Sequence, residues 1–169
     1  MIPPEKTIQD KKEVFVAWQK VTILHVMLRI AIFASGAGSN AKRIIEYSLL
    51  PTSAQDGGDK PFEVALIVCN KPQAGVLHIA AAHGIETLII EKEAFFRGDG
   101  YVPLLKQKKI DWIVLAGFLW KIPSSLIQAY PQHIINIHPA LLPKYGGKGM
   151  YGAHVHAAVI AAGETESGI

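Results

Sequence analysis

Charge and cysteine are scarce in this sequence. Charged residues make up 18% of its 169 residues, against about a quarter in a typical globular domain. The 17 Lys and Arg residues only slightly exceed the 14 Asp and Glu residues. Because the basic residues are scattered and form no stripe with interleaved aromatics, we expect no nucleic-acid partner. The single cysteine, Cys69, excludes an internal disulfide and indicates a reducing, cytoplasmic setting.

Long apolar runs are also missing. No stretch reaches the roughly 18 uninterrupted apolar residues of a membrane-spanning helix, because His25 and Arg29 interrupt the nearest candidate, residues 21–37. We therefore expect no membrane partner. Residues 1–26 precede Met27 and a strand-like run, and we interpret them as an N-terminal extension that is dispensable or lies upstream of the natural start at Met27. Residues 27–169 then form one domain.

Apolar material is ample, since half of the residues are hydrophobic. Apolar runs of strand length alternate with helical stretches, which predicts an α/β fold with an open, doubly wound, mainly parallel sheet and helices on both faces. Asn40 is predicted to cap the first helix and Gly84 to end the second. We expect strands at residues 28–34, 62–69, 87–90, 112–116 and 133–137, and helices over about 40–49, 73–83 and 101–109.

The first candidate site is the segment 35–40, which reads Ser-Gly-Ala-Gly-Ser-Asn between a buried strand and a helix. A helix N-terminus behind a glycine turn presents N–H groups to an anion. The Gly-x-Gly-x-x-Ala spacing also fits a dinucleotide site, but residues 68–71 (Val-Cys-Asn-Lys) offer no carboxylate for the ribose. We therefore predict a phosphate monoester bound by Gly38, Ser39 and Asn40, with a plain tight turn as the alternative.

The second candidate site is the segment 136–143, Asn-Ile-His-Pro-Ala-Leu-Leu-Pro. Residues i and i+2 of a strand face the same side, so Asn136 and His138 are predicted to project together at the carboxyl end of a strand, where open sheets bind ligands. Such a pair suits acyl transfer. The amide can donate to an oxyanion, an effect worth roughly 3 kcal/mol, and the imidazole can move protons for roughly 10²- to 10⁴-fold.

From Leu28 onward the chain resembles the phosphoribosylglycinamide formyltransferases, the folate-dependent GAR transformylases of purine synthesis. The resemblance is carried by the loop 35–40, by Val-Leu-Ala-Gly-Phe at 114–118 and by the segment 136–145. It implies a formyltransferase-like, Rossmann-related fold. It also implies direct transfer of a formyl group from 10-formyltetrahydrofolate to the amine of 5-phosphoribosylglycinamide, with no metal and no covalent enzyme intermediate.

The resemblance also implies roles for individual residues. Asn136 would contact the formyl donor and polarise its carbonyl, and His138 would be the catalytic proton donor. The family's folate-binding arginine aligns with Gly98, so the adjacent Arg97 is the candidate for that contact. The ribonucleotide phosphate would lie on Gly38, Ser39 and Asn40, and the pterin of the folate on Leu119, Trp120, Lys121 and Ile122.

One family feature has no counterpart here. Members of the family continue into a further strand and a loop whose aspartate pairs with the catalytic histidine and raises its pKa. This chain stops at residues 164–169, after Gly163 predicts a helix end. We therefore expect an incomplete chain with greatly reduced transferase activity and apolar surface exposed at its C-terminal end.

Alternatives remain open at this stage. A formyltetrahydrofolate hydrolase or a catalytically inactive phosphate-binding α/β module would share the same two segments.

His154 and His156 are two residues apart on an expected helix, so they cannot chelate a metal together, although either could lie near the substrate. We expect a monomer or a weak homodimer.

Overall fold

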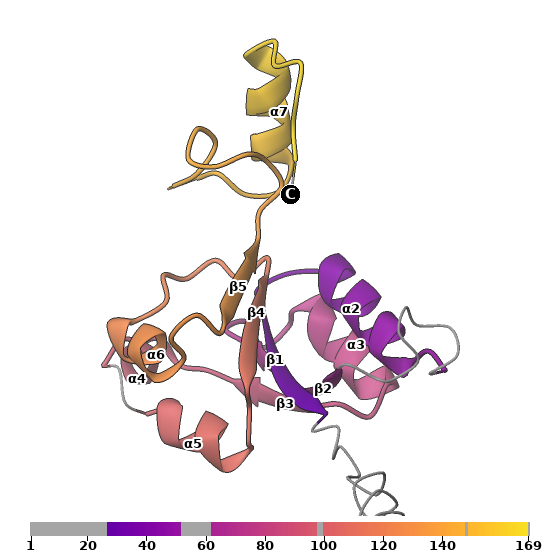
Figure 1. Cartoon of the computed structure of the whole chain (residues 1–169), viewed down its shortest axis with the longest axis vertical. Helices are drawn as coiled ribbons and strands as arrows, with labels where there is room; N and C mark the ends of the chain where they lie inside the picture. The colour runs from indigo at the N-terminus through magenta and orange to yellow at the C-terminus, as the bar shows by residue number, and fades with distance from the viewer. Residues whose placement is uncertain (1–26, 52–61, 98–99, 148, 169) are drawn as a thin grey trace, which may run out of the picture.

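The computed structural model describes residues 27–51, 62–97, 100–147 and 149–168 (Figure 1). The interpretation of residues 1–26 as an extension and the position of Gly98 lie outside the described residues. Among the helices that the structure describes, none is long and apolar enough to cross a membrane.

Five parallel strands form one sheet in the order β3-β2-β1-β4-β5. The predicted fold class is confirmed. Strand β3 begins one residue earlier than expected because Glu86 pairs in register with Leu66. Strand β5 begins one residue later because the His133 amide donates to the Tyr130 carbonyl in a turn. The strands are β1 (Leu28–Ala34), β2 (Phe62–Cys69), β3 (Glu86–Ile89), β4 (Trp112–Ala116) and β5 (Ile134–Ile137).

Helices cover both faces of the sheet (Figure 1). Alternate residues of the central strand β1 point to opposite faces: Ile32 packs with helices α2 and α3, and Phe33 packs with α4, α5 and α6. Cys69 is fully buried. The helices are α2 (Ser39–Leu49), α3 (Gly75–Ala82), α4 (Lys92–Phe96), α5 (Val102–Gln107), α6 (Ser124–Ala129) and α7 (Ala153–Ala161).

The predicted cap of the first helix is wrong. Helix α2 begins at Ser39 with Gly38 as its N-cap and no side-chain cap, so Asn40 is the second residue of the helix. The cause is the strand-to-helix turn, where the Gly38 carbonyl already accepts the first helical hydrogen bond from the Lys42 amide at 2.8 Å.

Two predicted helices are shorter than expected, for local reasons. Helix α3 starts at Gly75 because the Ala74 amide closes a turn onto the Lys71 carbonyl at 3.1 Å. Helix α5 ends at Gln107 because Lys109 takes a left-handed conformation, with φ of 54°. Gly84 ends α3 with φ of 66°, as predicted.

Helix α7 stands beyond the carboxyl ends of the strands, away from the other helices (Figure 1). It packs with the loop that follows β5 in a small core of its own. This core consists of Ala140, Tyr145 and Val155, with Met150, Ala158 and Val159 packed against them.

Candidate active site

A cleft of about 790 Å³ opens at the carboxyl edge of the sheet. The chain leaves β1 for β2 on one side, and β4 lies on the other, which makes this edge the topological switch point where open sheets bind ligands. Both candidate segments line this one cleft. Its walls include residues 36–40 of the turn from β1 into α2, residues 116–119 at and beyond the end of β4, residues 136–139 at and beyond the end of β5, and Gly147, Met150, Tyr151 and His156 from the loop and helix beyond.

The loop after β1 is shaped by Gly38. Its φ of 81° lies in the left-handed region, and a Cβ atom there would come within 2.7 Å of the Val76 Cβ atom on α3. Because the first hydrogen bond within α2 is donated by Lys42, the amides of Ser39 and Asn40 precede it and have no partner within the helix. Such amides at a helix N-terminus can donate to an anion.

Ser35 connects two walls of the cleft, a role that the sequence analysis missed. The residue is 1% exposed. Its amide donates to the Gly117 carbonyl at 3.1 Å, and its Oγ atom accepts a hydrogen bond from the Leu119 amide at 2.9 Å. A hydroxyl directly after the apolar run of residues 30–34 was the available signal, because a buried polar group needs a partner.

Asn136 and His138 line the cleft together, at the end of β5 and just after it. Asn136 is exposed and stands opposite Leu115 of β4 in the sheet register. The His138 Nε2 atom lies 2.7 Å from the main-chain carbonyl oxygen of Tyr145. A carbonyl only accepts, so Nε2 carries the proton of that hydrogen bond and Nδ1 is the other ring nitrogen.

A carboxylate is linked to this histidine through Tyr145. The Tyr145 hydroxyl donates to Glu164 at 2.6 Å, and Lys144 forms an ion pair with the same carboxylate. The hydrogen bonds from Lys144 and Tyr145 hold the pKa of Glu164 below its ordinary value. The hydrogen bond to Glu164 raises the pKa of Lys144 and of Tyr145. Sequence analysis did not identify Glu164 in this role.

The segment 119–122 is divided between two surfaces. Leu119 is 44% exposed and lines the main cleft. Trp120 turns into an aromatic cluster, with its ring centroid 5.7 Å from those of Phe95 and Phe96. Lys121 and Ile122 line a second pocket of about 410 Å³.

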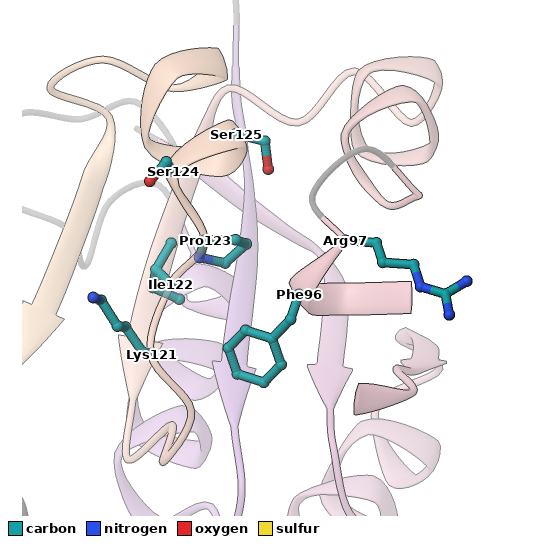
Figure 2. Close-up of a pocket in the computed structure, with 7 residues that line it drawn as sticks. All are labelled: Phe96, Arg97, Lys121, Ile122, Pro123, Ser124 and Ser125. Carbon is teal, nitrogen blue, oxygen red and sulfur yellow. The ribbon is translucent and has the colours of Figure 1, made fainter. Parts of the chain in front are cut away.

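That second pocket is shown in Figure 2, where Phe96 lies between Arg97 and Lys121. The charged ends of Arg97 and Lys121 point to opposite sides of the pocket. The Arg97 guanidinium donates to Glu93 at 3.2 Å on the exposed surface. Arg97 thus lies in the expected neighbourhood, with its side chain directed outward.

The two histidines of α7 differ in position. His156 lines the main cleft, whereas the ring of His154 packs against Tyr151 with centroids 5.7 Å apart. Within the parts of the chain that the structure describes, no three His, Cys, Asp or Glu side chains gather as metal ligands.

Comparison with known proteins places this arrangement in a family. Residues 28–169 match the family described as formyl transferase. The chain is 41% identical over 145 residues to the chloroplastic phosphoribosylglycinamide formyltransferase of Arabidopsis thaliana, covering 83% of this chain and 47% of that protein. It is 36% identical over 143 residues to the phosphoribosylglycinamide formyltransferase of Bacillus subtilis, covering 82% of this chain and 70% of that protein.

Solved structures of the same family share the fold of this chain. Glycinamide ribonucleotide transformylase 1 from Geobacillus kaustophilus superimposes with a TM-score of 0.67 at 35% identity, covering 84% of this chain and 71% of that one. The chain spans about half the length of the plant relatives that it matches. The family match, these identities and the shared fold show that the chain belongs to the formyl transferase family.

Proposed function

We propose that this chain transfers a formyl group from 10-formyltetrahydrofolate to the amine of 5-phosphoribosylglycinamide, a step of purine biosynthesis. The observation that carries the proposal is the shared cleft: a helix N-terminus suited to phosphate and the Asn136–His138 pair line one space of about 790 Å³. Two relatives named phosphoribosylglycinamide formyltransferase support the choice of substrate.

The ribonucleotide phosphate would bind at the start of α2. The amides of Ser39 and Asn40 would donate to its oxygens, and the Gly38 turn would let the phosphate approach the main chain. No acidic side chain lies in the first turn of α2, so nothing in that turn opposes an anion.

The chemical step needs an oxyanion donor and a proton carrier. The glycinamide amine attacks the formyl carbon, a new C–N bond forms, and the carbonyl oxygen becomes negatively charged. The Asn136 amide and protonated His138 would donate hydrogen bonds to that oxygen. The bond from the formyl carbon to N10 then breaks as N10 takes up a proton. The attacking amine loses one proton, so the transfer is balanced, and water can carry the proton between them.

The folate would extend from the main cleft along the segment 119–122. Leu119 faces the cleft, while Lys121 and Ile122 face the second pocket (Figure 2). The pterin would contact this segment, and the cationic end of Arg97 suits the carboxylates of a folate tail. For Arg97 this contact requires release from Glu93, its exposed partner.

The decisive experiment compares three proteins: the 169-residue chain, His138→Ala, and His78→Ala as a matched control. His78 is exposed on α3 and lies outside the cleft. Formylated glycinamide ribonucleotide and free formate are measured from 10-formyltetrahydrofolate, and ribonucleotide binding is measured by calorimetry. We expect formyl transfer, even if slow, to be lost in His138→Ala with ribonucleotide binding kept, and to be unchanged in His78→Ala.

Two other results would overturn the proposal. Release of formate without any glycinamide substrate would identify a formyltetrahydrofolate hydrolase. Ribonucleotide binding without formyl transfer in the unaltered chain would identify a phosphate-binding module.

Assembly and location are part of the same proposal. We propose a monomer or weak homodimer that needs no nucleic acid, and sedimentation velocity over a concentration series tests the oligomeric state.

A cytoplasmic location is proposed on the single buried Cys69, and cell fractionation tests this location. Two plant relatives carry the name chloroplastic, and recovery of this protein in an organelle fraction would contradict the cytoplasmic proposal.

A further inference from the structure

The proton position on His138 is set by a main-chain atom. The Nε2 atom lies 2.7 Å from the Tyr145 carbonyl oxygen, which accepts and never donates. This bond favours the neutral form with the proton on Nε2 and leaves Nδ1 as the ring nitrogen able to exchange a proton with reacting groups. Which tautomer a histidine adopts depends on the hydrogen bond made by its other nitrogen.

Tyr145 is held at both ends of its side chain. Its ring packs with Ala140 and Val155 in the small core, and the residue is 8% exposed. Its hydroxyl donates to Glu164 at 2.6 Å. Because the ring is fixed by packing and by this hydrogen bond, the carbonyl of the same residue has little freedom to move away from His138.

Glu164 is in turn placed by the end of helix α7. Gly163 adopts φ of 66°, its amide donates to the Ile160 carbonyl at 3.0 Å, and the Glu164 amide donates to the Val159 carbonyl at 3.3 Å. This pair of hydrogen bonds is the Schellman motif. It turns the chain so that the Glu164 side chain faces Tyr145.

We propose that Glu164 is a positioning residue for His138, acting through Tyr145 to keep the imidazole proton on Nε2. The proposal deepens the proposed function, because it concerns the histidine that would move protons during formyl transfer. Lys144 also pairs with Glu164, and its ammonium lies 5.7 Å from the centroid of the Tyr145 ring, but the hydrogen bonds that lead from Glu164 to His138 run through Tyr145. The hydrogen bond from the Tyr145 hydroxyl to Glu164, and not the Lys144–Glu164 ion pair, keeps the His138 proton on Nε2.

Nitrogen NMR of the protein labelled with ¹⁵N-histidine tests this without substrate. His138→Gln assigns the His138 signals among the seven histidines. We expect mainly the Nε2–H tautomer in the unaltered chain. In Tyr145→Phe and in Glu164→Ala the ratio of Nε2–H to Nδ1–H should fall about fivefold, the effect of one ordinary hydrogen bond.

Conservative variants separate positioning from general loss of structure. Glu164→Gln keeps an acceptor for the phenol. Lys144→Met removes the ion pair and the ammonium that lies 5.7 Å from the Tyr145 ring centroid, but leaves the phenol hydrogen bond in place, so both variants should retain the tautomer ratio. Tyr145→Phe keeps the packed ring, which keeps the small core folded. Glu166→Ala, an exposed carboxylate two residues further on, is the matched control and should leave the spectrum unchanged.

Each contrary outcome is specific. An unchanged ratio in both Tyr145→Phe and Glu164→Ala, or a mainly Nδ1–H tautomer in the unaltered chain, overturns the proposal. In the transfer assay we expect Glu164→Ala to lower kcat about fivefold with an unchanged KM for the ribonucleotide. If the unaltered chain does not transfer the formyl group but the Tyr145→Phe and Glu164→Ala variants still show the tautomer shift, the proposed function is refuted and the role of Glu164 stands.

Discussion

At the scale of single residues, Ser35 ties the two loops of the cleft together. In Ser35→Ala the Leu119 amide loses the acceptor that lies at 2.9 Å, in a partly buried position where water only partly replaces it. We expect a loss of about 1–2 kcal/mol in the free energy of unfolding, measured by urea denaturation. Ser167→Ala, on an exposed serine, is the control. Equal stability of the two variants would contradict the bridging role.

Gly38 and Gly36 lie in the same loop but differ sharply in the space available for a side chain. Gly38 combines φ of 81° with only 2.7 Å of space toward Val76, whereas a Cβ atom at Gly36 would meet nothing within 4 Å. We expect Gly38→Ala to lose about 2 kcal/mol or more of stability, and Gly36→Ala to lose far less. Chemical denaturation of both variants decides this, and a Gly36→Ala protein less stable than Gly38→Ala would contradict it.

At the scale of elements, helix α7 depends on its final glycine. A side chain at Gly163 would be forced into the left-handed region, at a cost of roughly 1–2 kcal/mol. We expect Gly163→Ala to reduce the hydrogen-exchange protection of the last turn of α7. Gly163→Asn should retain most of it, because asparagine tolerates this conformation. Protection equal to that of the unaltered chain in Gly163→Ala would show that the helix ends by another means.

Helix α5 ends in the same way without a glycine. Lys109 has φ of 54°, and the Ile110 amide donates to the Leu105 carbonyl at 3.0 Å. We expect Lys109→Gly to raise the melting temperature, with a gain of about 0.5–1 kcal/mol after the entropy cost of glycine. Gln107→Gly, within the helix, should instead lose a similar amount. A lower melting temperature for Lys109→Gly than for the unaltered chain would contradict the inference that the backbone is strained at Lys109.

At the scale of the whole molecule, the small core beyond the sheet should respond to pH. The bonds from Lys144 and Tyr145 lower the pKa of Glu164, so its stabilising contribution is present above pH 4.5 and is lost as the pH falls further. The bond to Glu164 raises the pKa of Tyr145 and of Lys144. Their contributions are therefore present below pH 10.0 and pH 10.5 and are lost as the pH rises.

We therefore expect exchange protection of α7 to be flat between pH 4.5 and 10.0 and to decline outside that window. Glu164→Gln should remove the decline on the acid side, because its amide does not titrate. The amides of β1, in the centre of the sheet, serve as the internal reference. A parallel decline of β1 and α7 would show global unfolding instead.

The architecture was largely predictable from the sequence. Three of the five strands have the expected bounds, because apolar runs such as residues 64–69 of β2 can be buried on both faces of a sheet. The helix ends were less predictable. They depend on hydrogen bonds such as that from Ala74 to Lys71, which local preferences do not specify. Asn40 is a good cap by preference, yet the Gly38 turn places it inside α2.

The exposed apolar surface expected near the C-terminal end is present. Leu141, Leu142 and Ile160 are 53%, 58% and 77% exposed. Their hydrophobic character was visible in the sequence. Their exposure follows from the position of α7, which stands away from the sheet (Figure 1).

The sequence by itself determined the alternation of strands and helices, the glycine turn after β1 and the Asn-x-His segment at the end of β5, because these depend on residue order and local conformation. Only the tertiary structure decided that Ser35 bridges to Leu119, that Trp120 turns into the aromatic cluster, and that Glu164 reaches Tyr145 behind His138. These contacts join residues between 19 and 84 positions apart, or depend on which way a side chain turns. Such contacts form only when the packing of the whole sheet and its helices brings the partners together.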